Sequence, residues 1–149
     1  MSIPLQVWVM RLGEQVFALE PRALKEVLEV SRLTPVPLAP PFVLGLLANQ
    51  GAILPLVDLG RWLGQSTGQP TLAAIITHHG QTLALAIHEV LRLYTPLEES
   101  SKTRPNQALS GQPFIASWLP WQNTDIPLLD LDGLIALLNQ QTLSALSPA

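Results

Sequence analysis

A ten-residue pattern that occurs twice restricts the folds open to this chain. Residues 54–63 align with residues 126–135 at a spacing of 72, with four positions identical and four conservative. A weaker match, which chance could also produce, has a spacing of 66 and places Gln15, Phe17, Ala18 and Leu19 on Gln81, Leu83, Ala84 and Leu85. Together the matches predict two similar halves, in each of which a strand leads into an Asp-capped helix. Two small β-barrels would meet this requirement; the alternative is that strand, aspartate and helix recur as common local structure.

Short apolar segments bounded by turn residues predict a mostly β fold. We expect two hairpins, formed by residues 5–10 with 16–19 and by 71–77 with 81–87, and further strands over 24–30, 52–57, 90–94, 114–119 and 124–129. A long polar loop is expected over 95–112.

Prolines and glycines bound the remaining segments. Pro55, which has no N–H to donate, predicts that its strand lies at a sheet edge or at a bulge. Pro40 and Pro41 favour a short helix over 42–47, because proline is accepted in the first helical turn.

Two further helices follow from capping and periodicity. Asp58 is placed to cap a helix over 59–63 that Gly64 would end. The spacing of apolar residues in 131–146 predicts an amphipathic C-terminal helix.

Charge and composition exclude several classes of function. The chain has 8 basic and 11 acidic residues, a net charge of −3, and only 13% charged residues, against about 25% in an average soluble domain. Without a basic surface to neutralise phosphates, we expect no nucleic-acid partner. The absence of cysteine excludes disulfides and thiolate zinc sites.

A membrane span is not expected either. The longest uncharged run, residues 33–57, contains five prolines, and each removes a backbone donor that lipid cannot replace. No basic residue precedes the apolar stretch at the start of the chain, and no small-residue cleavage site follows it. We therefore expect a cytoplasmic protein.

Histidines and aspartates are the residues that could carry chemistry. His78 and His79 are adjacent, so on a strand they would point to opposite faces and in a turn both would face solvent, and neither arrangement makes a chelate. The acidic group Asp125, Asp130 and Asp132 lacks the pattern of a calcium loop. Asp58 and Asp130 occupy matching positions before helices, where capping explains them better than catalysis.

Nucleophile and phosphate motifs are also missing. Ser110-Gly111 lacks the G-x-S-x-G context, and no glycine-rich phosphate loop precedes a helix. We therefore expect no enzyme, no catalytic residue, no metal site and no cofactor, and a binding function is favoured.

Four segments that follow one another carry a specific resemblance. They are LKEV at 24–27, LTPVP at 33–37, FVLGLLANQG at 42–51 and ILPLVDLGRWLG at 53–64. In order and spacing they resemble the CheW-like family, the coupling proteins of bacterial chemosensory arrays, which reads roughly V-x-E-I, T-P-V-P, G-x-x-N-L-R-G and I-x-P-V-x-D-L. Residues 87–97 and 125–138 are similar to later segments of the family.

The resemblance implies a fold and a function. The fold is mostly β, with two small five-stranded β-barrels that share a core, short helices and a C-terminal helix. Residues 1–149 would form one such domain of two barrel subdomains, between which the terminal segments can cross over. The implied function is a non-catalytic adaptor whose partners are the regulatory domain of a CheA-type histidine kinase and the cytoplasmic tip of a chemoreceptor.

Five residues are implied to lie near partner surfaces: Leu24, Glu26, Gly45, Gln50 and Gly51. For each there is a simpler reading: Leu24 as core, Glu26 as a solvated strand charge, and the glycines as residues required by packing or backbone conformation. At Gln50 the family usually has arginine, and an amide lacks the charge and the five-donor fork of a guanidinium. This difference puts the standard receptor contact in question.

Two other classes of function are the alternatives. A metal-dependent hydrolase would use His78, His79 and His88 with Asp125, Asp130 or Asp132. A β-barrel that binds a small apolar ligand would need an open pocket, and a core filled by side chains would exclude it.

Overall fold

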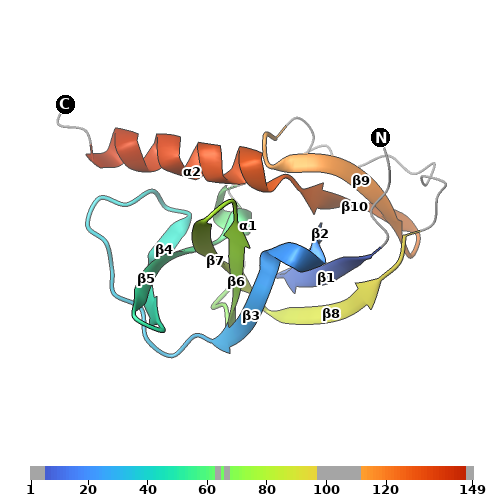
Figure 1. Ribbon diagram of the computed structural model, residues 1–149, viewed down its shortest axis with the longest axis horizontal. Coiled ribbons are helices and arrows are strands. Elements are labelled where there is room, and N and C mark those ends of the chain that lie inside the picture. The colour runs from blue at the N-terminus through green and yellow to red at the C-terminus, as the bar shows by residue number, and fades with distance from the viewer. Residues whose placement is uncertain (1–5, 63–64, 66–67, 97–111, 147–149) are drawn as a thin grey trace.

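The structure, a computed structural model, describes residues 6–62, 65, 68–96 and 112–146 (Figure 1). It contains a short 3-10 helix, Pro21–Ala23, and two α-helices, α1 (Leu59–Trp62) and α2 (Leu131–Leu146). Its strands are β1 (Val7–Leu12), β2 (Gln15–Leu19), β3 (Leu24–Glu29), β4 (Val43–Asn49), β5 (Ala52–Val57), β6 (Leu72–His78), β7 (Gln81–Ile87), β8 (Glu89–Tyr94), β9 (Ile115–Trp121) and β10 (Thr124–Leu129).

The strands form two five-stranded sheets, which confirms the mostly β fold. Sheet A has the order β8-β1-β2-β10-β9, and sheet B has the order β3-β6-β7-β5-β4. Along the chain, five strands and a helix are followed by five more strands and a helix. Strands β1 and β2 of the first half lie in sheet A with β8, β9 and β10 of the second half. Strands β6 and β7 of the second half lie in sheet B with β3, β4 and β5 of the first half. The two halves therefore exchange their first hairpins.

The pairing confirms both repeat spacings. Leu56 of β5 pairs in parallel with Ala84 of β7, and Leu128 of β10 pairs in parallel with Ala18 of β2. Leu56 and Leu128 are 72 residues apart, and Ala18 and Ala84 are 66 apart. Each sheet also contains a β-bulge at the equivalent place. The register of β3 shifts at Lys25, and the register of β8 shifts at Leu91, which lies 66 residues further along the chain.

Within each sheet, the two edge strands are linked by hydrogen bonds. In sheet B, Thr34, which follows β3, exchanges two backbone hydrogen bonds with Leu46 of β4, at 2.9 and 2.8 Å. In sheet A, the Tyr94 hydroxyl of β8 donates to the carbonyl of Pro120 in β9. These contacts link the two edge strands of each sheet, as the predicted barrels require.

Aspartate caps connect each sheet to its helix in the same way. The N–H groups of Asp58 and Asp130 donate to the carbonyls of Phe42 and Phe114, at 2.7 and 2.8 Å. The Oδ1 atom of Asp58 accepts from the N–H of Arg61 at 3.0 Å, and that of Asp130 accepts from the N–H of Gly133 at 3.1 Å. The capping prediction for both aspartates is confirmed.

A continuous core spans the two sheets. It includes Met10 and Phe17 from sheet A and Leu56 and Ile75 from sheet B, all at most 4% exposed. Between the two halves, the Trp62 ring packs edge-on against the rings of Phe42 and Phe114, at centroid distances of 4.4 and 6.5 Å. Helix α2 runs along one side of the molecule (Figure 1), and its Leu131, Leu134 and Ile135 are buried in this core.

Two predictions about proline are wrong. Residues 42–47 are not a helix, because β4 pairs with β5 from Val43 to Asn49 and this ladder outweighs the helix signal of the preceding prolines. Pro55 lies neither at an edge nor at a bulge: β5 is an interior strand, and Pro55 pairs with Leu46. Its missing N–H is tolerated because the parallel pairing with β7 involves Leu56 and Val57, just beyond it.

The other elements agree with expectation where they are described. The helix over 131–146 has the predicted bounds, and the two hairpins and the other strands are present with small shifts at their ends. Most of the loop over 95–112, the last residue of the helix predicted over 59–63, and Gly64, expected to end that helix, lie outside the described residues. No helix in the described part of the chain is long and apolar enough to cross a membrane.

Candidate partner-binding surface

The turn between β4 and β5 presents two of the predicted partner residues to solvent. Asn49 pairs with Ala52, so Gln50 and Gly51 form a two-residue hairpin loop. Their φ angles of 50° and 81° are both positive, as a type I′ turn requires. A Cβ atom on Gly51 would meet nothing within 4 Å, so backbone conformation and not packing explains the glycine.

Glu26 and Gln50 meet across the two edge strands of sheet B. The Gln50 Nε2 atom donates to Glu26 Oε2 at 3.4 Å, although β3 and β4 lie at opposite ends of the strand order. Gln50 is exposed and Glu26 half-buried. The residue that replaces the family arginine therefore lies beside a carboxylate that an arginine at this position could pair with.

Leu24 and Gly45 are less accessible. Leu24 is half-buried and packs against the core, opposite Ile76 of β6. Gly45 is buried, and a Cβ there would lie 2.9 Å from the carbonyl oxygen of Thr34 and 3.2 Å from the Cβ of Leu33. Close packing of β4 on the segment after β3 explains this glycine.

Three exposed apolar side chains on the same half of the molecule were not among the predicted residues. Ile53 in β5 is 70% exposed, Leu38 in the segment between β3 and β4 is 89% exposed, and Val27 in β3 is 36% exposed. Val27 could have been found from the alternation along β3, where residues 25, 27 and 29 are exposed. Ile53 and Leu38 carry no such signal, because their exposure depends on how the hairpin and the proline-rich segment pack.

One histidine of the hydrolase alternative has a structural role, and one apolar cavity bears on the ligand-binding alternative. His88 accepts a hydrogen bond at Nδ1 from the N–H of Gly13, at 2.8 Å, and its Nε2 lies 3.2 Å from the carbonyl of Gln69. A small cavity lined mainly by apolar residues such as Leu12, Phe17 and Phe114 has a volume of about 30 Å³, whereas ligand pockets measure about 300–1,000 Å³. This cavity is too small for an organic ligand.

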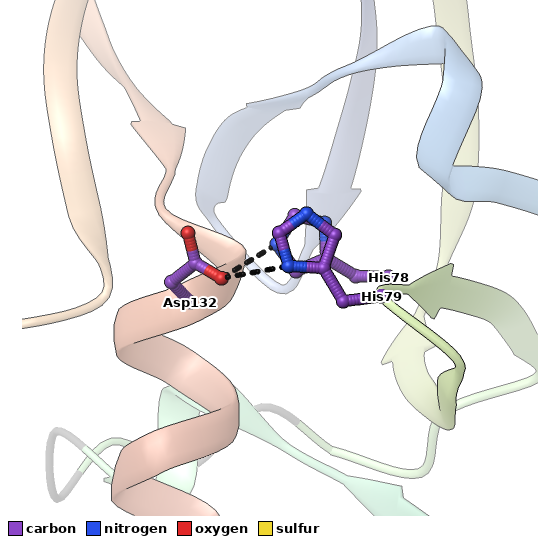
Figure 2. Close-up of side chains that lie close together, drawn as sticks. All are labelled: His78, His79 and Asp132. Atoms are coloured by element: carbon purple, nitrogen blue, oxygen red, sulfur yellow. Dashed lines mark hydrogen bonds and ion pairs between the residues drawn. The ribbon is translucent and has the colours of Figure 1, made fainter.

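His78 and His79 do not point to opposite faces, as neighbouring residues on a strand would. Their rings stack with centroids 4.0 Å apart, and Figure 2 shows both beside one oxygen of Asp132. His78 Nε2 lies 2.8 Å and His79 Nδ1 lies 3.6 Å from Asp132 Oδ1. The physical reason is the φ of His79, which at 48° departs from the extended backbone on which neighbouring side chains alternate.

Comparisons with known proteins agree with the fold. The family model described as the CheW-like domain matches residues 6–139. A chemotaxis protein CheW of Rhizobium meliloti is 38% identical over 66 residues, and a probable chemotaxis protein CheW of Rhizobium etli is 32% identical over 66 residues. Each match spans 44% of this chain and 43% of the relative's length.

A solved structure is similar over most of its length. The scaffolding protein CheW from Thermoanaerobacter tengcongensis superimposes with a TM-score of 0.73, over 88% of this chain and 87% of that one, at 21% identity. This likeness confirms the fold, including the two five-stranded units.

Proposed function

Because this chain belongs to the CheW-like family, we propose that it is a non-catalytic adaptor of a bacterial chemosensory pathway. The observation that supports the proposal best is the family match, which spans 134 consecutive residues and both sheets. The names of the relatives, which refer to chemotaxis and scaffolding, point the same way. The proposed location is the cytoplasm.

The proposed partners are a CheA-type histidine kinase, bound through its regulatory domain, and the cytoplasmic tip of a chemoreceptor. We assign the kinase contact to β3, where Leu24 and Glu26 lie, and the receptor contact to the adjacent turn after β4, where Gln50 and Gly51 lie. Exposed apolar side chains such as Val27 and Ile53 extend this surface, and apolar residues with few charges are typical of interface centres. Gly45 supports the surface through packing, because it is buried.

Binding to the kinase regulatory domain tests this proposal. Leu24→Asp is expected to weaken the complex, but Leu24 also packs against the core, so the circular-dichroism spectrum must show that the variant folds. Val27→Asp is a second test, because Val27 is more exposed. A carboxylate buried without a partner in the interface is expected to raise the Kd by about tenfold or more.

Leu93→Asp is the matched control for Val27→Asp. Leu93 is 39% exposed and occupies the equivalent position in β8 of sheet A, paired with Trp8 as Val27 is paired with Ala74. Calorimetric titration should show weaker kinase binding for Val27→Asp and unchanged binding for Leu93→Asp. Equal effects of the two variants would reject the assignment to β3, and no binding of the intact chain to either kinase or receptor would reject the adaptor function.

The position of Gln50 gives a separate test of receptor binding. Gln50→Arg would place a guanidinium beside the Glu26 carboxylate, now 3.4 Å from the amide nitrogen, and restore the family residue. We expect stronger binding to the receptor tip, and Gln50→Lys should restore less because it supplies charge without the planar fork. Unchanged or weaker binding of Gln50→Arg would show that the missing guanidinium is not what sets the receptor affinity.

A further inference from the structure

We propose that His78, His79 and Asp132 form a binding site for a divalent transition-metal cation such as Zn²⁺. The two imidazoles come from the end of β6 and the turn to β7, and the carboxylate comes from the first turn of α2. The three possible ligand atoms all lie within 4.8 Å of one another. Two imidazoles and a carboxylate are a donor set that Zn²⁺ accepts, with a water in the fourth position.

The distances suit a tetrahedral ion after small side-chain rotations. With zinc–ligand bonds of 2.0–2.2 Å, neighbouring ligand atoms in a tetrahedron lie about 3.4 Å apart. The two distances from Asp132 Oδ1, 2.8 Å to His78 Nε2 and 3.6 Å to His79 Nδ1, lie on either side of this value. Figure 2 shows both nitrogens directed at the same oxygen, and these side chains could separate around an ion.

The backbone at His79 is the second observation. The equivalent turn of sheet A has Gly13 in the same position, with a φ of 60°, whereas His79 adopts a φ of 48°. A side chain in this region costs conformational free energy that glycine does not. The positive φ turns the second ring toward the first, so the unfavourable conformation is what creates the pair of donors.

The surroundings leave room for an ion and its water. The cluster lines a surface hollow of about 260 Å³, whose other walls include Gln81, Ile135 and Asn139. The side chains of His79 and Asp132 are 77% and 73% exposed, so a cation can enter without burying uncompensated charge. A bound ion would connect the β6–β7 turn to α2, across the same gap that Asn139 and Gln81 span with a 3.5 Å hydrogen bond.

Zinc titration of the untagged, metal-free chain tests the site. Calorimetry and competition with a zinc indicator should show one Zn²⁺ bound per chain. His79→Gly is the most informative variant because it removes a ligand and introduces the residue type found in the equivalent turn, which favours folding. The Kd for Zn²⁺ should rise by about tenfold or more in His79→Gly and in Asp132→Asn, since each removes a ligand.

Matched controls use a histidine and a carboxylate outside the cluster. His88→Gln and Glu29→Gln should leave the Kd unchanged. At the same concentration, Zn²⁺ should raise the melting temperature of the native chain by more than that of His79→Gly. Zinc affinity equal in the native chain and His79→Gly, or affected as strongly by His88→Gln, would overturn the proposal, as would the absence of stoichiometric binding.

Discussion

Replacing Gly133 with alanine should destabilise the protein, although the same exchange stabilises most helices. Gly133 is in the first turn of α2, and alanine is favoured over glycine by up to about 1 kcal/mol in helices. A Cβ atom there would lie 1.9 Å from the carbonyl oxygen of Pro113 and 2.9 Å from its carbon. Because backbone and not a flexible side chain is in the way, the segment before β9 must move.

The size of the effect follows from what that segment holds. The Phe114 carbonyl accepts from the Asp130 N–H at 2.8 Å, and the Gln112 carbonyl accepts from the Ile115 N–H at 3.2 Å. Loss of these two bonds costs about 1–3 kcal/mol. Displacement of the buried Phe114 side chain adds about 1–3 kcal/mol. After the helix gain, a net loss of about 3 kcal/mol remains, which lowers the Tm of a chain of this size by about 6–12 °C.

Thermal and urea unfolding, followed by circular dichroism, measure this loss. Gln140→Ala is the control, because Gln140 is exposed in the same helix and its replacement reports helix propensity without a clash. If Gly133→Ala were as stable as the native chain, or shifted in the same direction as Gln140→Ala, the close approach of α2 to Pro113 would not be what requires glycine at this position.

Two further substitutions test the caps and the packing of β4. Asp58→Ala and Asp130→Ala each remove a helix cap worth about 1 kcal/mol. Urea unfolding should show the larger loss of stability for Asp58→Ala, because Asp58 is fully buried and also lies 3.6 Å from the Arg61 guanidinium. Equal or reversed losses would contradict this order. Gly45→Ala should break the Thr34–Leu46 backbone pair and lower the free energy of unfolding by about 1–3 kcal/mol. The folded fraction should keep its affinity for the kinase domain. A lower affinity without a lower Tm would instead indicate that Gly45 contacts the kinase directly.

The sequence predicted the elements that depend on local pattern. Alternating apolar residues indicated the strands, and Asp58 and Asp130 were identified as caps because a carboxylate before a helix has a local reason to be there. The repeat spacings also indicated two similar halves. Spacing alone could not show that the halves exchange hairpins, because pairs such as Ala18 with Leu128 are 110 residues apart and depend on tertiary packing.

Two features could not be predicted from sequence pattern alone. The strand at Val43–Asn49 was read as a helix because proline preferences are local, whereas the ladder with β5 is not. The contact between His78 and His79 depends on the positive φ of His79, a conformation uncommon for residues other than glycine. Of the predicted partner residues, Glu26 and Gln50 are brought together and Gly45 is buried, which family motifs alone do not indicate.

The exchange of hairpins has a consequence for the order of assembly during synthesis. Every strand of sheet B has been synthesised once residue 87 is made, so that sheet can form before the C-terminal part of the chain is complete. Sheet A needs β10, which ends at Leu129, to pair with β2. The β1–β2 hairpin is therefore made well before β10, the strand that pairs with β2. Until β10 is made, one edge of β2 is unpaired in the growing chain.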